Sequence, residues 1–139
     1  MHLSSQHSEY VIYDGGGGHL NFTVPSWASK VEIVATITGH GFGKDNANCA
    51  EFCDHEHHYE MNGFSTYEWH PIVYSNEGCE NELSNGVVAN QFGSWPYGRA
   101  GWCAGQDVKQ WTYDITSWTD STGGNNHLTY QGLFNGQEY

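Results

Sequence analysis

The segment Gly39–Gly63 reads GHGFGKDNANCAEFCDHEHHYEMNG and holds the densest group of chemically capable side chains in the chain. It contains a Cys-x-x-x-Cys pair around a glutamate, then three histidines within four residues, and it ends at Asn62-Gly63. An Asn-Gly pair is the strongest short-range signal for a tight β-hairpin turn. We therefore expect a β scaffold that carries this segment as a loop and a hairpin.

Strand patterns lie on both sides of this hairpin. Apolar residues alternate with polar ones in Leu20–Val24, Lys30–Thr38 and Trp111–Ile115, which is typical of strands with one buried face. Further short strands are expected at Tyr10–Tyr13, Tyr67–Ile72, Val87–Val88 and Leu128–Phe134. The Gly- and Pro-rich stretch Phe92–Gly105 predicts a long ordered loop. Many short strands without an amphipathic helix predict an all-β fold, an antiparallel β-sandwich or jelly roll forming a single domain over residues 1–139.

The charge balance excludes two classes of partner. Sixteen acidic residues stand against four basic ones, for a formal net charge of -12. Nucleic acids and anionic membrane surfaces are polyanions, so neither is expected to bind. No apolar run approaches the roughly 18 residues that a membrane-spanning helix needs. We expect no nucleic-acid and no membrane partner.

The cysteines indicate the compartment. Cys49, Cys53, Cys79 and Cys103 allow three pairings, and their spacing does not match a zinc ribbon. Two disulfides are expected, and therefore an oxidising setting: a secreted protein, extracellular or periplasmic, with its export signal upstream of this sequence. The sequon that begins at Asn21, Asn-Phe-Thr, fits glycosylation in such a setting.

The histidines suggest a metal site. A two-residue turn at Asn62-Gly63 pairs His57 with Glu68 and His55 with His70, and alternation puts these four side chains on one face. Opposed Cβ atoms lie about 5 Å apart, so the imidazoles of His55, His57 and His70 could share zinc or copper(II). The alternative is an acidic, solvated strand that happens to carry histidines.

Two further groups of residues could contact a substrate. Glu51 lies inside the Cys-x-x-x-Cys pair beside Phe52, where partial desolvation would raise its pKa towards the range of acid–base catalysis. The alternative is a solvated glutamate in a loop that a disulfide merely closes. Arg99 stands in sequence among Trp95, Tyr97 and Trp102, and aromatic faces beside a guanidinium suit sugar rings. The alternative there is a structural arginine stacked on tryptophans.

The chain resembles a known family from about Val24 to Tyr139. The strings GHGFGKDNANCAEFC and WPYGRAGWC, with His57-His58, Met61-Asn62-Gly63 and Gly78-Cys79 between them, are similar to the C-terminal jelly-roll domain of peptide-N-glycosidase F. That enzyme hydrolyses the amide between asparagine and the first GlcNAc of N-glycans. Its architecture is related to that of the copper-dependent peptidylglycine hydroxylating monooxygenases.

The resemblance implies roles for individual residues. It implies disulfides Cys49–Cys53 and Cys79–Cys103, an essential Glu51, and Arg99 and Trp102 in the lining of the glycan site. The family's principal catalytic aspartate belongs to an N-terminal domain that is absent from this sequence. The resemblance therefore implies half of an N-glycan amidase site that is not active alone. Family domains continue past Gly132–Tyr139 into one more strand, so two alternatives stay open: the chain is a fragment of a larger protein, or its N-terminal residues supply that strand.

Two other functions stay open. The first is a non-catalytic extracellular module that binds carbohydrate, or that assembles with a second jelly-roll domain or with itself through sheet edges. The second is a histidine-rich copper or zinc site. The amidase needs no cofactor, and its partners would be an N-glycan and a second domain.

Overall fold

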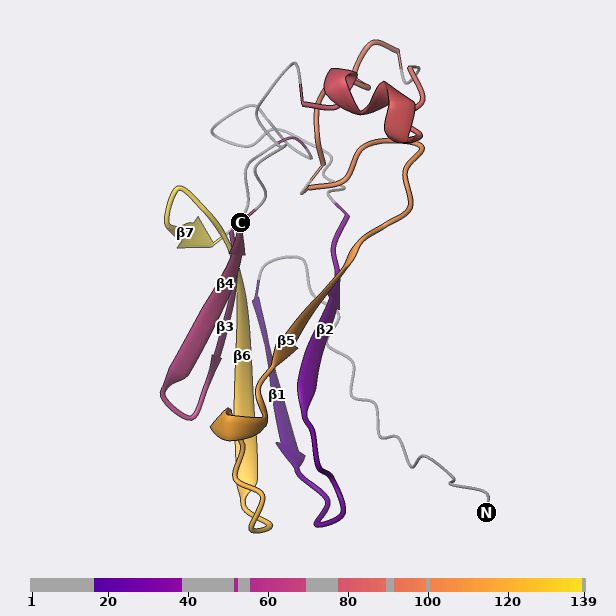
Figure 1. Ribbon diagram of the computed structural model, residues 1–139. Helices are drawn as coiled ribbons and strands as arrows, with labels where there is room; N and C mark the ends of the chain where they lie inside the picture. Colours follow the sequence, from indigo (N-terminus) through magenta and orange to yellow (C-terminus); the bar gives the residue numbers. More distant parts are fainter. Residues whose placement is uncertain are drawn as a thin grey trace, which may run out of the picture.

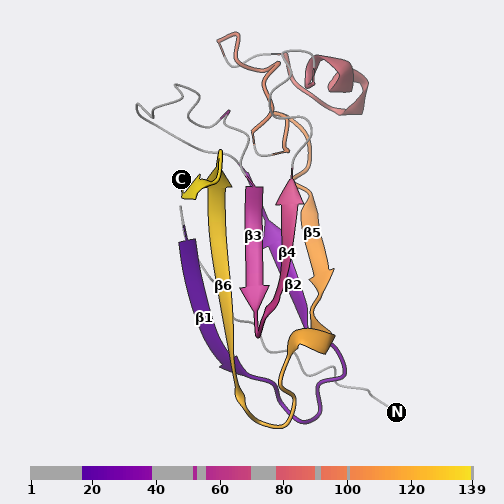
Figure 2. The same ribbon diagram turned by 90° about the vertical axis from the view of Figure 1, so that its left-hand side faces the viewer.

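The computed structural model describes residues 17–38, 52, 56–69, 78–89, 92–99 and 101–138. Its body consists of two antiparallel β-sheets that face each other (Figure 1). The larger sheet has the order β1-β6-β3-β4, with the short β7 also paired to β6 (Figure 2). The smaller sheet pairs β2 with β5. The strands are β1 (Gly17–Thr23), β2 (Glu32–Thr36), β3 (Glu56–Met61), β4 (Phe64–Trp69), β5 (Gln110–Asp114), β6 (Asn125–Phe134) and β7 (Gln137–Glu138).

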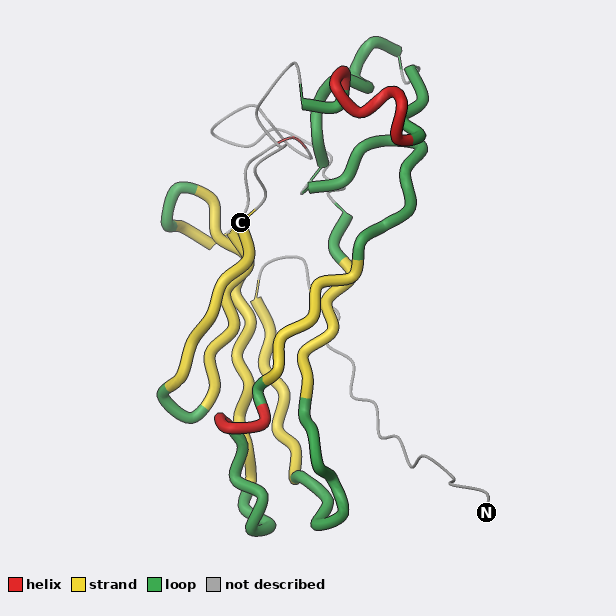
Figure 3. Tube along the Cα trace, viewed as in Figure 1, coloured by secondary structure: helices red, strands yellow, loops and turns green. Residues whose placement is uncertain are grey.

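This arrangement confirms the expected all-β, antiparallel sandwich. The helices named in the described residues are two short 3-10 helices, η2 (Glu80–Asn85) and η3 (Thr116–Trp118) (Figure 3), and Phe52 also has 3-10 conformation. None of the helices in this part of the chain is long and apolar enough to span a bilayer. Jelly-roll connectivity, the single-domain assignment and the strand expected at Tyr10–Tyr13 remain predictions, and that strand lies outside the described residues.

The β3–β4 hairpin forms at the predicted turn. Asn62 and Gly63 have φ angles of 51° and 83°, as a turn with two left-handed central residues requires. Met61 pairs with Phe64 and His57 with Glu68, which confirms the predicted register. The return strand begins at Phe64, directly after the two-residue turn and earlier than the expected Tyr67.

The core lies between the sheets. Its buried residues come from both layers: Ile33, Tyr59, Met61, Ile115 and Leu128. Partly buried Leu20, Phe22 and Ala35 pack against them. Leu20, Phe22, Ile33, Ala35 and Ile115 occupy the inward positions of the three predicted alternating strands, so alternation correctly identified the buried faces of those strands.

A buried asparagine fastens the hairpin to the rest of the sandwich. Asn126 is fully buried, and its Oδ1 accepts hydrogen bonds from Asn62 Nδ2 at 2.9 Å and from the Asp120 backbone N–H at 2.7 Å. Asn62 Nδ2 also donates to the Trp118 carbonyl at 2.8 Å. The turn residue therefore has a second role, because its amide connects the hairpin to the loop before β6.

Beyond one end of the sheets, residues 78–89, 92–99 and 101–109 form an irregular region that we call the loop region (Figure 1). The disulfide Cys79–Cys103 joins its two halves, and both cysteines are fully buried. Val87 and Trp95 pack against the disulfide. The pairing of Cys79 with Cys103 is thus confirmed, as is the ordered loop for the described part of Phe92–Gly105.

One strand prediction was wrong. Val87 and Val88 form no strand; they follow η2, and Val88 N–H donates to the Ala104 carbonyl at 2.9 Å. The expected strand Leu128–Phe134 lies within β6, and β7, which was not predicted, follows it across a turn at Asn135-Gly136. Asn135 and Gly136 have φ angles of 53° and 74°, so this second hairpin uses the same Asn-Gly turn as the first.

Candidate functional site

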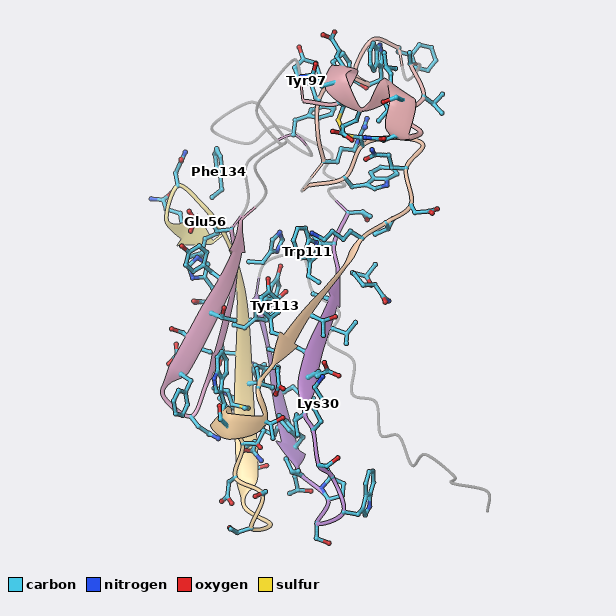
Figure 4. All side chains as sticks on the ribbon, viewed as in Figure 1. Lys30, Glu56, Tyr97, Trp111, Tyr113 and Phe134 are labelled. Atoms are coloured by element: carbon cyan, nitrogen blue, oxygen red, sulfur yellow. A yellow bond between two sulfur atoms is a disulfide. The ribbon has the colours of Figure 1, made fainter. Side chains whose placement is uncertain are left out.

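The predicted sugar-binding residues lie in the loop region, at the end of the molecule where Tyr97 is labelled in Figure 4. Arg99 N–H donates to the Trp102 carbonyl at 2.8 Å, and Trp102 N–H donates to the Arg99 carbonyl at 3.1 Å. Gly101 has a φ of 78°, which glycine adopts readily within such a turn. The turn therefore holds the backbones of Arg99 and Trp102 directly opposite each other.

Arg99 is buried, with 6% of its surface exposed, which is rare for a guanidinium. Its guanidinium carbon lies 5.0 Å from the centre of the Phe52 ring, within cation–π range. Arg99 Nη2 donates to Ser94 Oγ at 3.3 Å. The aromatic ring that lies on the guanidinium is Phe52, whereas the sequence suggested Trp95, Tyr97 and Trp102 as its neighbours; the role of Arg99 in binding sugar stays a prediction.

Phe52 connects the two motifs that the sequence singled out. Its ring also packs at an angle against Tyr97, with 5.4 Å between the ring centres. Phe52 belongs to the CAEFC stretch, whereas Tyr97 and Arg99 belong to WPYGRAGWC. Segments more than forty positions apart in the sequence therefore meet in one cluster of two aromatic rings and one cation.

The two tryptophans of this loop have different surroundings. Trp102 is half-buried, and its indole N–H donates to the Gln106 carbonyl at 2.9 Å. The indole N–H is therefore hydrogen-bonded within the loop, and Trp102 could contact a sugar only through the face of its ring. Trp95 packs against the disulfide between Cys79 and Cys103, which gives it a structural role. Its predicted contact with substrate stays a prediction.

The catalytic half of the prediction lies outside the described residues. The residues concerned are Glu51 and the cysteines that flank it, Cys49 and Cys53. The role of Glu51 and the Cys49–Cys53 disulfide therefore stay predictions.

His57 lies inside the sandwich. It is buried on the inward face of β3, and its Nδ1 lies 2.7 Å from the hydroxyl of Tyr130 on β6. The two rings also stack, with 6.0 Å between their centres and 11° between their planes. The alternative of a wholly solvated strand is thus wrong for His57, since its neighbours on that face, Tyr59 and Met61, belong to the core.

The metal prediction is neither confirmed nor excluded. His55 and His70 lie outside the described residues. In the part of the chain that is described, no three His, Cys, Asp or Glu side chains come together as a metal site would require. On the opposite face of β3, His58 Nε2 lies 2.9 Å from Glu56 Oε2, and its ring stacks on Tyr67.

The sequon residue Asn21 lies on the outward, exposed face of β1. Its Oδ1 accepts a hydrogen bond from His127 Nδ1 at 2.8 Å, across the β1–β6 pair. Glycosylation of Asn21 stays a prediction. An exposed face is where such a modification could be accommodated.

Sequence reasoning missed Phe52 and Tyr130 as site residues. Phe52 carried a usable signal, because it sits between the candidate glutamate and the second cysteine of the same motif. Tyr130 carried none, since its contact with His57 depends on the register between β3 and β6, which are far apart in the chain.

The fold and the loop region define a disulfide-containing, all-β sandwich domain with an arginine–aromatic cluster at one end. A family model described as peptide-N-glycosidase F, C terminal, matches residues 12–137. The chain belongs to this family. The comparison with curated proteins and the comparison with solved structures each yield no match.

Proposed function

We propose that this chain provides one half of an N-glycan amidase site and works together with an N-terminal partner domain. Family membership supports the class of reaction, the hydrolysis of the amide that joins an N-glycan to asparagine. The chain is then inactive alone, because the family's principal catalytic aspartate is not in it. The buried disulfide and the family together support secretion into an oxidising compartment.

The contact between Phe52 and Arg99 carries this proposal. Glu51 precedes Phe52 in the chain, and adjacent Cα atoms are about 3.8 Å apart. A Phe52 ring 5.0 Å from the Arg99 guanidinium therefore supports an arrangement in which the CAEFC glutamate and the GRAGWC loop belong to one site.

The residues then have separate tasks. In the reaction, water adds to the amide carbonyl and the C–N bond breaks, which yields aspartate and a glycosylamine. Glu51 accepts or donates the proton that moves between water and leaving group. The Trp102 ring packs on a sugar face. Arg99, being buried, acts mainly by holding Phe52 and the loop in place.

Glycan release is the test. A denatured N-glycoprotein is incubated with this chain alone, and with the chain joined to an N-terminal domain of the same family. We expect release only from the joined protein, and a loss of about 100-fold or more in Glu51→Gln. Glu60→Gln, an exposed change on the outer face of β3, is the matched control and should keep full activity.

Two results would overturn the proposal. One is a joined protein that folds and releases no glycan. The other is a Glu51→Gln variant as active as Glu60→Gln. Titration of the chain with chitobiose checks the sugar contact separately, since binding that survives in Trp102→Ala would remove Trp102 from the sugar site.

A further inference from the structure

The outward face of the larger sheet brings two histidines together. In the β1–β6 pair, Leu20 lies opposite Leu128 and both point into the core, so the residues on either side of each point outward. His19 and His127 are two of these, exposed and diagonal to each other across the pair. Their ring centres are 5.7 Å apart, with 34° between the planes. Figure 2 looks onto this face.

The hydrogen bond to Asn21 sets the tautomer of His127. Asn21 Oδ1 can only accept, so His127 Nδ1 carries the hydrogen in their 2.8 Å contact. The other ring nitrogen, Nε2, then carries the lone pair. Histidines that bind metals through one nitrogen usually donate the other N–H to an oxygen in this way, which fixes the ring orientation and strengthens the ligand.

We propose that His19 and His127 form a two-histidine site for a divalent transition-metal ion, Zn²⁺ or Cu²⁺. A metal–nitrogen bond of about 2.1 Å puts an ion roughly 3.2 Å from the centre of a coordinating imidazole. Two rings that share one ion can therefore have centres up to roughly 6.4 Å apart. The observed 5.7 Å lies within this limit. Imidazole nitrogen suits both metals.

The surroundings favour a cation. The chain has a formal net charge of -12, and the described outward positions of the larger sheet include no Lys or Arg. Glu60 lies in the same cross-strand row as His19, with Thr129 between them. No third His, Cys, Asp or Glu in the described residues completes the site. Water fills the remaining coordination positions, and the site is open.

This site is separate from the predicted one at His55, His57 and His70. His57 points into the sandwich, whereas His19 and His127 point away from it. The proposal is also independent of the amidase function.

Metal titration of the untagged chain tests the proposal. Binding of Zn²⁺ is measured calorimetrically and as a rise in thermal midpoint, because an ion that binds only the folded state stabilises it. We expect His19→Ala and His127→Ala each to weaken binding by about tenfold or more, and Asn21→Ala by about tenfold through the lost orientation. His58→Ala, on the same outward face, is the control and should bind as the parent does.

A second measurement does not depend on stability. Substoichiometric Cu²⁺ is paramagnetic, so it should broaden the ring proton signals of His19 and His127 before those of His58. An absence of binding at millimolar Zn²⁺ would refute the site. So would equal weakening by His58→Ala and His127→Ala, or broadening of all histidine signals together.

Discussion

Removal of the Cys79–Cys103 disulfide should destabilise the folded chain by about 3.5 kcal/mol. The two cysteines are 24 positions apart, and loop-closure entropy for a loop of that length is about -11.6 cal/mol/K in the chain-entropy treatment. Multiplied by 298 K, this gives the stated value. Both cysteines are fully buried, so alanine is the suitable replacement, because it leaves no unsatisfied polar group.

The assay is urea unfolding of the Cys79→Ala/Cys103→Ala double variant, followed by far-ultraviolet circular dichroism. For a denaturant slope of about 2 kcal/mol/M, the midpoint should fall by about 1.7 M. Alkylation of the single variant Cys103→Ala provides the control. Its remaining Cys79 thiol should become reactive only on unfolding, because the loop region packs around it.

A double variant within about 0.5 kcal/mol of the parent would refute the reasoning. It would mean that the loop region is held by other contacts, or that it unfolds separately from the sheets. Hydrogen exchange distinguishes these cases, since separate unfolding would leave the amides of β3 and β6 fully protected while those of η2 exchange.

Two further predictions concern backbone geometry and pH. Gly105→Ala should lower the free energy of unfolding, measured with a chemical denaturant, by about 2–4 kcal/mol. Gly105 has a φ of 97°, and an added Cβ would lie 2.6 Å from the Gly86 carbonyl oxygen. Gly123 has a φ of 96° and open space around the added methyl, so Gly123→Ala should lower the free energy of unfolding by only about 1 kcal/mol. Equal losses of stability in the two variants would contradict the packing argument. The hydrogen bonds that Asp120 accepts from the Thr122 hydroxyl, and then from the Thr122 backbone N–H, lower the pKa of the Asp120 carboxyl. The ionised carboxylate therefore stabilises the fold at pH values above its ordinary pKa of 3.8. This stabilisation is lost as the pH falls through the lowered pKa of the folded state. Thr122→Val should raise that pKa in a carboxyl NMR titration and destabilise the chain at pH 6, with the difference from the parent disappearing towards pH 2; an unchanged Asp120 titration would contradict this.

Local signals predicted the fold where the structure depends on neighbouring residues. The Asn62-Gly63 turn forms with the expected register, because only residues that accept positive φ close a two-residue hairpin. The same signal at Asn135-Gly136 was present in the sequence and marks β7, which was overlooked. Val87-Val88 shows the opposite failure: two β-branched residues suggest a strand, yet the disulfide and η2 keep them in the loop region.

The candidate site was predicted in its composition and not in its contacts. Arg99 and its aromatic setting were expected from the WPYGRAGWC motif. The packing of Phe52 on Arg99 was not, since two loops that are distant in sequence must first be brought together by the sheets. Nor could alternation along β3 decide which of its two faces is inside the molecule.

By itself, the sequence determined the all-β class and the hairpin with its register, and its motifs carried the family resemblance that implied the partner of Cys79. Each of these depends either on a local pattern of residues or on sequence motifs that follow one another in the family's order. Only the tertiary structure decided that His57 is enclosed beside Tyr130 while His127 lies exposed beside His19 and Asn21. The reason is physical. Asn21 and His127 are 106 positions apart, and β1, β3 and β6 become neighbours only when burial of the apolar core selects one order and register of the strands.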